Sequence, residues 1–168
     1  GIGFSMTQFG RKWIDQLDEN AIPVSASRYA DLLARHNDRF GDSYRERSQE
    51  AVKCYQSHVY LACCAMCGAA AESVMLALAA ARLGSREEAL KKYKPKGGRG
   101  RIEKLLLSGA SDYVSRMMPR YTELLKYWRD NASHGEASGF GSEESYTSLV
   151  LLLRFVIFAD EHWDELTM

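Results

Sequence analysis

The chain has 168 residues, of which 46% are hydrophobic and 26% are charged. This is the composition of an ordinary soluble globular protein, and the length suits one domain that buries a hydrophobic core. The 22 Lys and Arg residues balance 22 Asp and Glu residues, so the formal net charge is zero. This balance excludes a general electrostatic attraction of the whole chain to nucleic acid or to an anionic membrane.

The N-terminal part is expected to differ from the rest of the chain. Residues 1–6 are interpreted as a cloning remnant with Met6 as the natural start, and no signal peptide is expected because no basic segment precedes an apolar run. Residues 7–42 are predicted to form an N-terminal helical extension, with helices at residues 9–20 and 27–40.

Free thiols further along the chain agree with a cytoplasmic location.

Residues 43–168 are predicted to form an up-and-down helical bundle, because apolar residues recur there at helical spacing. After a break at residues 41–43, a long helical region is predicted over residues 45–83, bent near residues 56–58 and ended by Gly84. Later helices are expected from residue 85, over residues 102–107 and 113–131, and from residue 142 through 163, with loops at residues 94–100 and 135–141. No run of β-branched residues has a period of two, so the predicted fold class is all-α.

The longest apolar stretch covers residues 59–81 and contains one charged residue, Glu72, near its middle. Its length would suit a membrane-spanning helix. The stretch is nevertheless rich in alanine and only weakly hydrophobic, and a carboxylate at its centre would be costly in lipid. A buried helix of the bundle is therefore predicted, and no membrane partner is expected.

The segment that points most directly to a function is Arg129-Asp130-Asn131-Ala132-Ser133-His134, at the end of the helix predicted over residues 113–131. An arginine keeps its charge and binds phosphate, whereas a histidine titrates near neutral pH and can move a proton. On an ideal helix, residues five apart point about 140° away from each other. Arg129 and His134 can therefore converge only if the helix unwinds near Ala132 and Ser133, or if a second copy of the chain completes the site.

This segment resembles the motif of the HEPN domain family, in which an arginine precedes a histidine by a few residues and a polar residue follows the arginine. The alanine-rich segment 60–83 with Glu72 inside it also looks like the second long helix of that fold. A closing apolar helix at residues 143–166 fits as well, so the resemblance covers about residues 45–166.

The resemblance implies a helical homodimer that is often a metal-independent endoribonuclease of toxin or defence systems, with RNA as its substrate. By position, His134 would be the general acid and base, Arg129 would hold the scissile phosphate, Asp130 would orient it, and Glu72 would support the site. The ribose 2′-hydroxyl would be the nucleophile, and no cofactor or metal would be needed. Where one branch of the family has a tyrosine two residues after the histidine, this chain has Glu136, so regulation through that tyrosine is not expected.

Two other interpretations remain open from the sequence. Arg129 could form a salt bridge and His134 could cap the helix, and Glu72 could be a buried acid whose partner is Arg129 itself. Alternatively, the chain could be a catalytically inactive HEPN-like dimerisation module that binds nucleic acid, a nucleotide or a partner protein such as an antitoxin.

A basic segment is the best candidate for contacts with a nucleic-acid backbone, because positive side chains bind phosphates without reading the base sequence. Its members are Lys91, Lys92, Lys94, Lys96, Arg99, Arg101 and Lys104. The segment contains one aromatic residue, Tyr93, and no nucleotide-binding P-loop ending. A solvated loop without a ligand is the alternative interpretation.

The cysteines include a C-x-x-C spacing at Cys64 and Cys67, with Cys63, Cys54 and His58 nearby. These residues fall inside a helical pattern, whereas zinc knuckles place such pairs on a turn. They are therefore interpreted as small buried residues, and no metal site is predicted. His36 and His162 lie among charged residues and are interpreted as surface side chains.

Overall fold

The computed structural model describes residues 26–133 and 139–168. The predicted helix at residues 9–20 and the predicted catalytic residue His134 lie outside these ranges. Within them the chain is helical almost throughout and contains no strand, which confirms the all-α prediction. The helices are α2 (Ala26–Ala34), α3 (Asn37–Phe40), α4 (Asp42–Gln56), α5 (Tyr60–Leu83), α6 (Arg86–Tyr93), α7 (Gly98–Leu107), α8 (Asp112–Ser133), α9 (Ser142–Glu161) and α10 (Trp163–Thr167).

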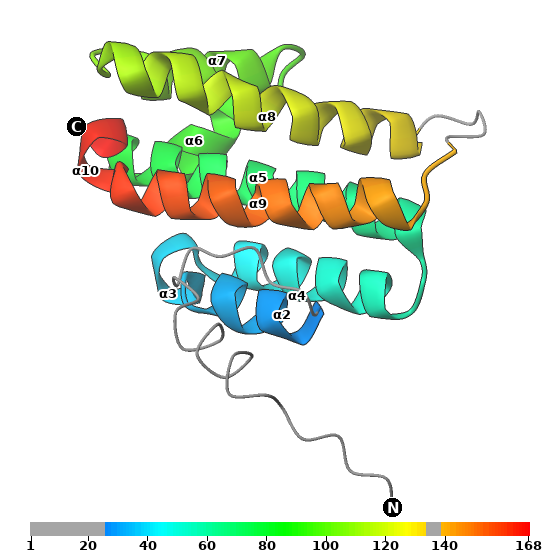
Figure 1. The fold of residues 1–168 in the computed structure, drawn as a ribbon. Coiled ribbons are helices and arrows are strands. Elements are labelled where there is room, and N and C mark those ends of the chain that lie inside the picture. The colour runs from blue at the N-terminus through cyan, green and yellow to red at the C-terminus, as the bar shows by residue number, and fades with distance from the viewer. Residues whose placement is uncertain (1–25, 134–138) are drawn as a thin grey trace, which may run out of the picture.

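Helix α5 is the central element of the bundle. It is 24 residues long, α4, α8 and α9 pack along it, and α6, α7 and α10 also contact it (Figure 1). Small buried residues such as Cys67, Ala70 and Ala71 let the neighbouring helices approach closely. Among the described helices, α5 is the one that is long and apolar enough to cross a membrane, and 56% of its most apolar window is buried inside the bundle.

Helices α2 and α3 belong to the same core as the rest of the bundle. They pack against α4, α5 and α9, and Tyr29, Leu33 and Phe40 are buried. The Tyr44 hydroxyl donates a hydrogen bond of 2.9 Å to the Leu33 carbonyl, which ties α2 to α4. The helix predicted over residues 27–40 is interrupted by a turn at residues 35–36, so it forms two short helices instead of one.

The helical region predicted over residues 45–83 is also two helices, because the chain reverses at residues 57–59. His58 adopts a left-handed backbone conformation with φ of 59°, a region in which histidine is several-fold enriched among residues other than glycine. Its Nδ1 atom lies 2.8 Å from the hydroxyl of Tyr60, the first residue of α5. The other end of α5 is as predicted, since Gly84 has a φ of 65° and ends the helix.

The loop predicted at residues 94–100 is shorter than expected, because α7 already begins at Gly98. Gly97 turns the chain with a φ of 78°, and the Gly98 amide donates a hydrogen bond of 2.8 Å to the Pro95 carbonyl. A β-carbon at Gly98 would lie 1.6 Å from the Tyr93 carbonyl oxygen, so only glycine fits there. This tight turn places Arg99 on the first turn of α7, where its side chain points into the bundle instead of into solvent.

Candidate functional site

The site begins with a close crossing of α5 and α8. Gly68 is buried where the two helices meet, and a β-carbon built on it would lie 2.6 Å from the β-carbon of Arg129 and 2.8 Å from the Leu125 carbonyl oxygen. The absence of a side chain at Gly68 therefore lets α8 lie directly on α5. Because Glu72 follows Gly68 by one helical turn, it lies on the same face of α5, and this face meets Arg129.

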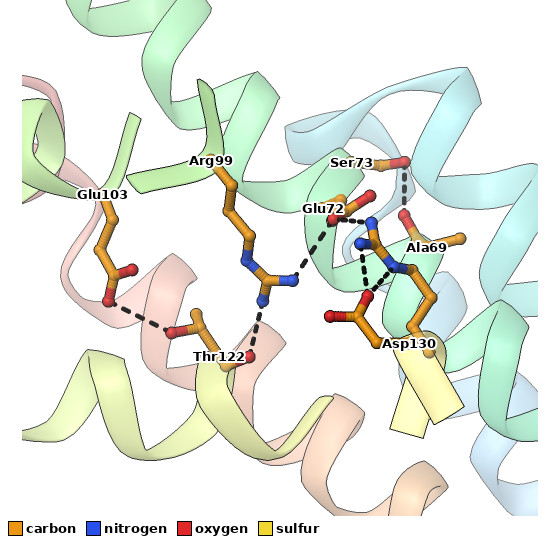
Figure 2. A network of polar contacts seen from close by, with 8 residues as sticks. Ala69, Glu72, Ser73, Arg99, Glu103, Thr122 and Asp130 are labelled. Atoms are coloured by element: carbon orange, nitrogen blue, oxygen red, sulfur yellow. Dashed lines mark hydrogen bonds and ion pairs between the residues drawn. The ribbon is translucent and has the colours of Figure 1, made fainter. Parts of the chain in front are cut away.

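Arg129 is held by two carboxylates. Its Nε and Nη2 atoms donate hydrogen bonds of 3.1 and 2.7 Å to Oδ1 of Asp130, and its Nη1 atom forms an ion pair with Oε1 of Glu72 (Figure 2). The Glu72 side chain is only 13% exposed, whereas that of Arg129 is 31% exposed. The guanidinium is thus anchored at α5 and α8 but still reaches solvent.

A second arginine binds the same carboxylate from the opposite side. Nη1 of Arg99 lies 3.3 Å from Oε1 of Glu72, and Nη2 of Arg99 donates a hydrogen bond of 2.6 Å to the Thr122 carbonyl on α8 (Figure 2). The Thr122 hydroxyl in turn donates to Glu103 at 3.4 Å. Because Oε1 of Glu72 contacts both arginines, Glu72 joins α5, α7 and α8 through one oxygen atom.

The carboxylates of Glu72 and Asp130 pair with the guanidinium groups of Arg99 and Arg129, and the charge of a third carboxylate, Glu103, also acts on Arg99. Partial burial by itself lowers the pKa of Arg129, but the hydrogen bonds and charges of Asp130 and Glu72 outweigh it and raise the pKa overall. Burial lowers the pKa of Arg99, an effect that Glu72 opposes. Burial and the adjacent Glu72 carboxylate raise the pKa of Tyr93, which faces the same cluster from α6. Both arginines therefore remain cations at neutral pH.

This arrangement fixes the Arg129 guanidinium, a partly exposed cation, close to the C-terminal end of α8. Such a charge can bind a phosphate or another oxyanion, and because Glu72 and Asp130 hold Arg129 in place, little reorganisation is needed on binding. The sequence left two ways to bring Arg129 and His134 together: unwinding of the helix near Ala132 and Ser133, or a second copy of the chain. Helix α8 continues through Ser133, so the helix does not unwind at those two residues. The structure also shows the ion pair between Glu72 and Arg129 that one interpretation of the sequence anticipated.

The basic segment is divided between the surface and the interior. Lys91, Lys92, Lys94, Lys96 and Lys104 are exposed, and Lys91 forms ion pairs with Glu87 and Glu88. Arg101 is also exposed, but its guanidinium donates hydrogen bonds of 3.0 to 3.3 Å to the carbonyls of residues 92, 95 and 96 and so closes the turn before α7. Arg99 is turned inward to Glu72, a role that the sequence analysis did not anticipate.

The cysteines of α5 are buried, as predicted. Cys63, Cys64 and Cys67 have no exposed surface, and burial raises the pKa values of the Cys64 and Cys67 thiols, which keeps them protonated. Within residues 26–133 and 139–168, no group of three His, Cys, Asp or Glu side chains is arranged to hold a metal ion.

Two histidines have partners of their own. His36 is not a free surface residue, because its Nδ1 atom lies 2.8 Å from the carboxylate of Asp160 on α9. His162 lies 3.4 Å from Glu165. These contacts tie α10 and the α2–α3 segment to the end of α9 and have no link to Arg129.

Three of the four predicted catalytic residues, Glu72, Arg129 and Asp130, therefore form one cluster, and the fourth, His134, lies outside the described residues. Sequence reasoning missed Gly68 and the inward role of Arg99. The signal for Gly68 was present, since it is the one glycine in an alanine-rich helix and precedes Glu72 by one turn. No protein-family model, curated protein sequence or solved structure matches the chain.

Proposed function

We propose that this protein is a metal-independent endoribonuclease that resembles HEPN enzymes and acts as a cytoplasmic homodimer. The observation that supports the proposal most strongly is the state of Arg129. Two carboxylates fix its guanidinium near the end of α8, and the side chain is still 31% exposed. A phosphodiester in solution can reach this cation, and His134 follows it by five residues in the chain.

In the proposed reaction, Arg129 binds the scissile phosphate and stabilises the negative charge that develops on its oxygens. The ribose 2′-oxygen attacks the phosphorus atom while its proton passes to a base, and the bond from phosphorus to the 5′-oxygen breaks. The 5′-oxygen then takes up a proton from an acid. His134 residues of the two protomers serve as this base and acid. The products are a 2′,3′-cyclic phosphate and a 5′-hydroxyl, and no metal is involved.

The homodimer is proposed because two residues five apart in the sequence, as Arg129 and His134 are, would point about 140° away from each other on an ideal helix. Since α8 is helical through Ser133, a second copy of the chain is the simpler way to bring an arginine and a histidine together. The outer face of α8 also carries large exposed apolar side chains, with Leu124 39% and Tyr127 56% exposed. Such residues are enriched in interfaces, so this face is the proposed contact between the protomers.

The test is cleavage of cellular RNA by the purified full chain in EDTA, compared with His134→Ala, Arg129→Ala and Arg120→Ala variants. Arg120 is an exposed arginine on the same helix and serves as the matched control. We expect cleavage by the wild type and by Arg120→Ala, loss of at least 100-fold in the other two, and a 2′,3′-cyclic phosphate on the product. A substrate with a 2′-deoxy sugar at the cut site should resist cleavage.

The dimer has its own test. Because the proposed reaction uses His134 of both protomers, adding an excess of His134→Ala chains to the wild type should lower the activity by forming mixed dimers with a single histidine, whereas an excess of Arg120→Ala chains should not. Leu124→Glu combined with Tyr127→Glu should give monomers in analytical ultracentrifugation, whereas Met168→Glu, at the exposed C-terminus, should not. A fully active monomer would contradict the composite site.

The alternative is a catalytically inactive HEPN-like module that binds nucleic acid, a nucleotide or a partner protein. One observation favours this binding module: Arg129 already forms ion pairs with Glu72 and Asp130, as expected of an arginine with a structural role. If a folded wild-type dimer leaves RNA intact in EDTA but binds it in fluorescence anisotropy, this second function replaces the first.

A further inference from the structure

A cavity of about 390 Å³ lies between α4, α5 and α6, and Glu72 and Tyr93 are among the residues that line it. Its floor is one face of α5, where the small residues Ala69, Ser73, Ala77 and Ala80 recur every three to four positions. The Ser73 hydroxyl donates to the Ala69 carbonyl at 3.0 Å, so the hydroxyl is occupied by its own helix. The size of the cavity falls within the range of small-molecule sites, and the composition of its floor suits an apolar body.

Two arginines line the same cavity and meet at one residue, Ser43. Nη1 of Arg47 donates a hydrogen bond of 2.9 Å to the Ser43 carbonyl, and Nη2 of Arg86 donates one of 3.0 Å to the Ser43 hydroxyl. Arg47 comes from α4 and Arg86 from α6, so the two walls of the cavity each contribute a cation. Among the residues that the structure describes, neither guanidinium forms an ion pair with a carboxylate.

Arg47 and Arg86 share one residue, Ser43, at the edge of the same cavity. Arg39, Arg45, Arg99 and Arg129 each have an acidic partner within 4.0 Å, whereas Arg47 and Arg86 have none among the described residues. Arg47 and Arg86 thus place two positive charges at the edge of a cavity whose floor is rich in alanine, with Glu72 as the acidic residue in its lining. An anion between them would gain charge-assisted hydrogen bonds from both side chains.

We infer that this cavity binds a small amphipathic anion, in which a carboxylate or phosphate head contacts Arg47 and Arg86 and an apolar body lies on the alanine face of α5. We propose an anion because neither Arg47 nor Arg86 forms an ion pair with a carboxylate among the described residues. We propose an apolar body because Ala69, Ala77 and Ala80 form the floor of the cavity. This site goes beyond the proposed nuclease function and does not depend on it.

The test is isothermal titration calorimetry of the full chain with decanoate and with decyl phosphate, both kept below the concentrations at which they form micelles. We expect one molecule of at least one probe to bind per chain. Binding should weaken about tenfold or more in the double variant Arg47→Ala/Arg86→Ala. Arg45→Ala is the matched control, because Arg45 lies on the same helix but forms its ion pair with Asp42 outside the cavity.

The apolar part is tested with Ala77→Leu, which fills the floor of the cavity, and with Ala81→Leu, which adds the same group to an exposed position of α5. Ala77→Leu should abolish binding and Ala81→Leu should preserve it, with the circular dichroism spectrum of both unchanged. Whichever probe binds identifies the head group that the arginines accept.

Three results would overturn the inference. The first is that the wild type binds neither probe. The second is that the arginine variant and Ala77→Leu bind as tightly as the wild type, since binding would then occur elsewhere. The third is that decanol or inorganic phosphate binds as tightly as the amphipathic probes, because then the head or the body would contribute nothing.

Discussion

The β-carbon of Arg129 lies directly over Gly68, in a space that no larger residue could share without moving α8. This contact sets how closely the two long helices cross. It also sets where the Arg129 guanidinium meets Glu72, one turn further along α5. The position of the proposed phosphate-binding group thus depends on Gly68, a residue that has no side chain.

Replacing Gly68 by alanine should separate α5 from α8, because the new methyl group would clash with Arg129 and with the Leu125 backbone. We expect the free energy of unfolding in urea to fall by about 1–3 kcal/mol, the usual effect of overpacking. The control is Gly100→Ala in α7, where a β-carbon meets open space. That variant should be as stable as the wild type or up to about 1 kcal/mol more stable. Equal stability of the two variants would show that the crossing tolerates extra volume.

Glu72→Gln should destabilise the fold through charge, since it leaves the guanidinium groups of Arg99 and Arg129 facing each other without the carboxylate between them. We expect a loss of about 3 kcal/mol, the lower end of the range for a broken buried ion pair, because Arg129 also binds Asp130 and is partly exposed. Adding Arg99→Met removes one of the two cations and should recover part of this loss. If the double variant is no more stable than Glu72→Gln alone, the two arginines do not share Glu72 energetically.

The ion pair of Glu72 with Arg129 was within reach of the sequence because a buried acid in an alanine-rich helix needs a cationic partner. The inward orientation of Arg99 toward Glu72 could not be predicted from the sequence. Its direction depends on the turn at Gly97 and Gly98, and the composition of that stretch indicates a loose loop as readily as a tight turn. Only the close approach of Gly98 to the Tyr93 carbonyl distinguishes the two.

The ends of the helices likewise depend on tertiary contacts that the sequence pattern does not contain. The apolar pattern over residues 45–83 is nearly continuous, so it predicts helix throughout, yet the chain reverses at residues 57–59. The reversal lets α4 bury Ala51 and Val52 against α5, a gain that depends on tertiary packing and not on local propensity. The all-α class, in contrast, follows from periodicity alone and was predicted.

Lys94 and Lys96 should contribute to RNA binding without contributing to stability, because both are exposed and neither forms an ion pair among the described residues. In the variant Lys94→Ala/Lys96→Ala we expect weaker binding of single-stranded RNA in fluorescence anisotropy. The slope of log affinity against log salt should become shallower by about 1.4, since two phosphate contacts are lost. Arg99→Met should instead lower stability, because Arg99 bonds Glu72 and Thr122 inside the bundle. An unchanged slope for the lysine variant would place the RNA contacts elsewhere.

Glu165 should make the fold sensitive to acid. It accepts hydrogen bonds from Ser111, including one of 2.5 Å from the backbone amide, and these bonds lower its pKa, with a smaller effect from His162. A carboxylate whose pKa is lower in the folded state stabilises the protein above its unfolded pKa of about 4.3, and this stabilisation is lost as the pH falls through the folded value. Glu165→Gln should therefore be less stable than the wild type at pH 7, by about 0.5–1 kcal/mol for so exposed a contact.

The difference between the two proteins should shrink below pH 4.3 and vanish once Glu165 is protonated in the folded wild type. Urea unfolding followed at pH 7, 5, 4 and 3 measures it. Glu161→Gln is the control, since Glu161 is an exposed acid near the end of α9 without an ion pair among the described residues. Its difference from the wild type should stay small at every pH. If Glu165→Gln shows the same flat profile, the contact with Ser111 does not hold the start of α8 to α10.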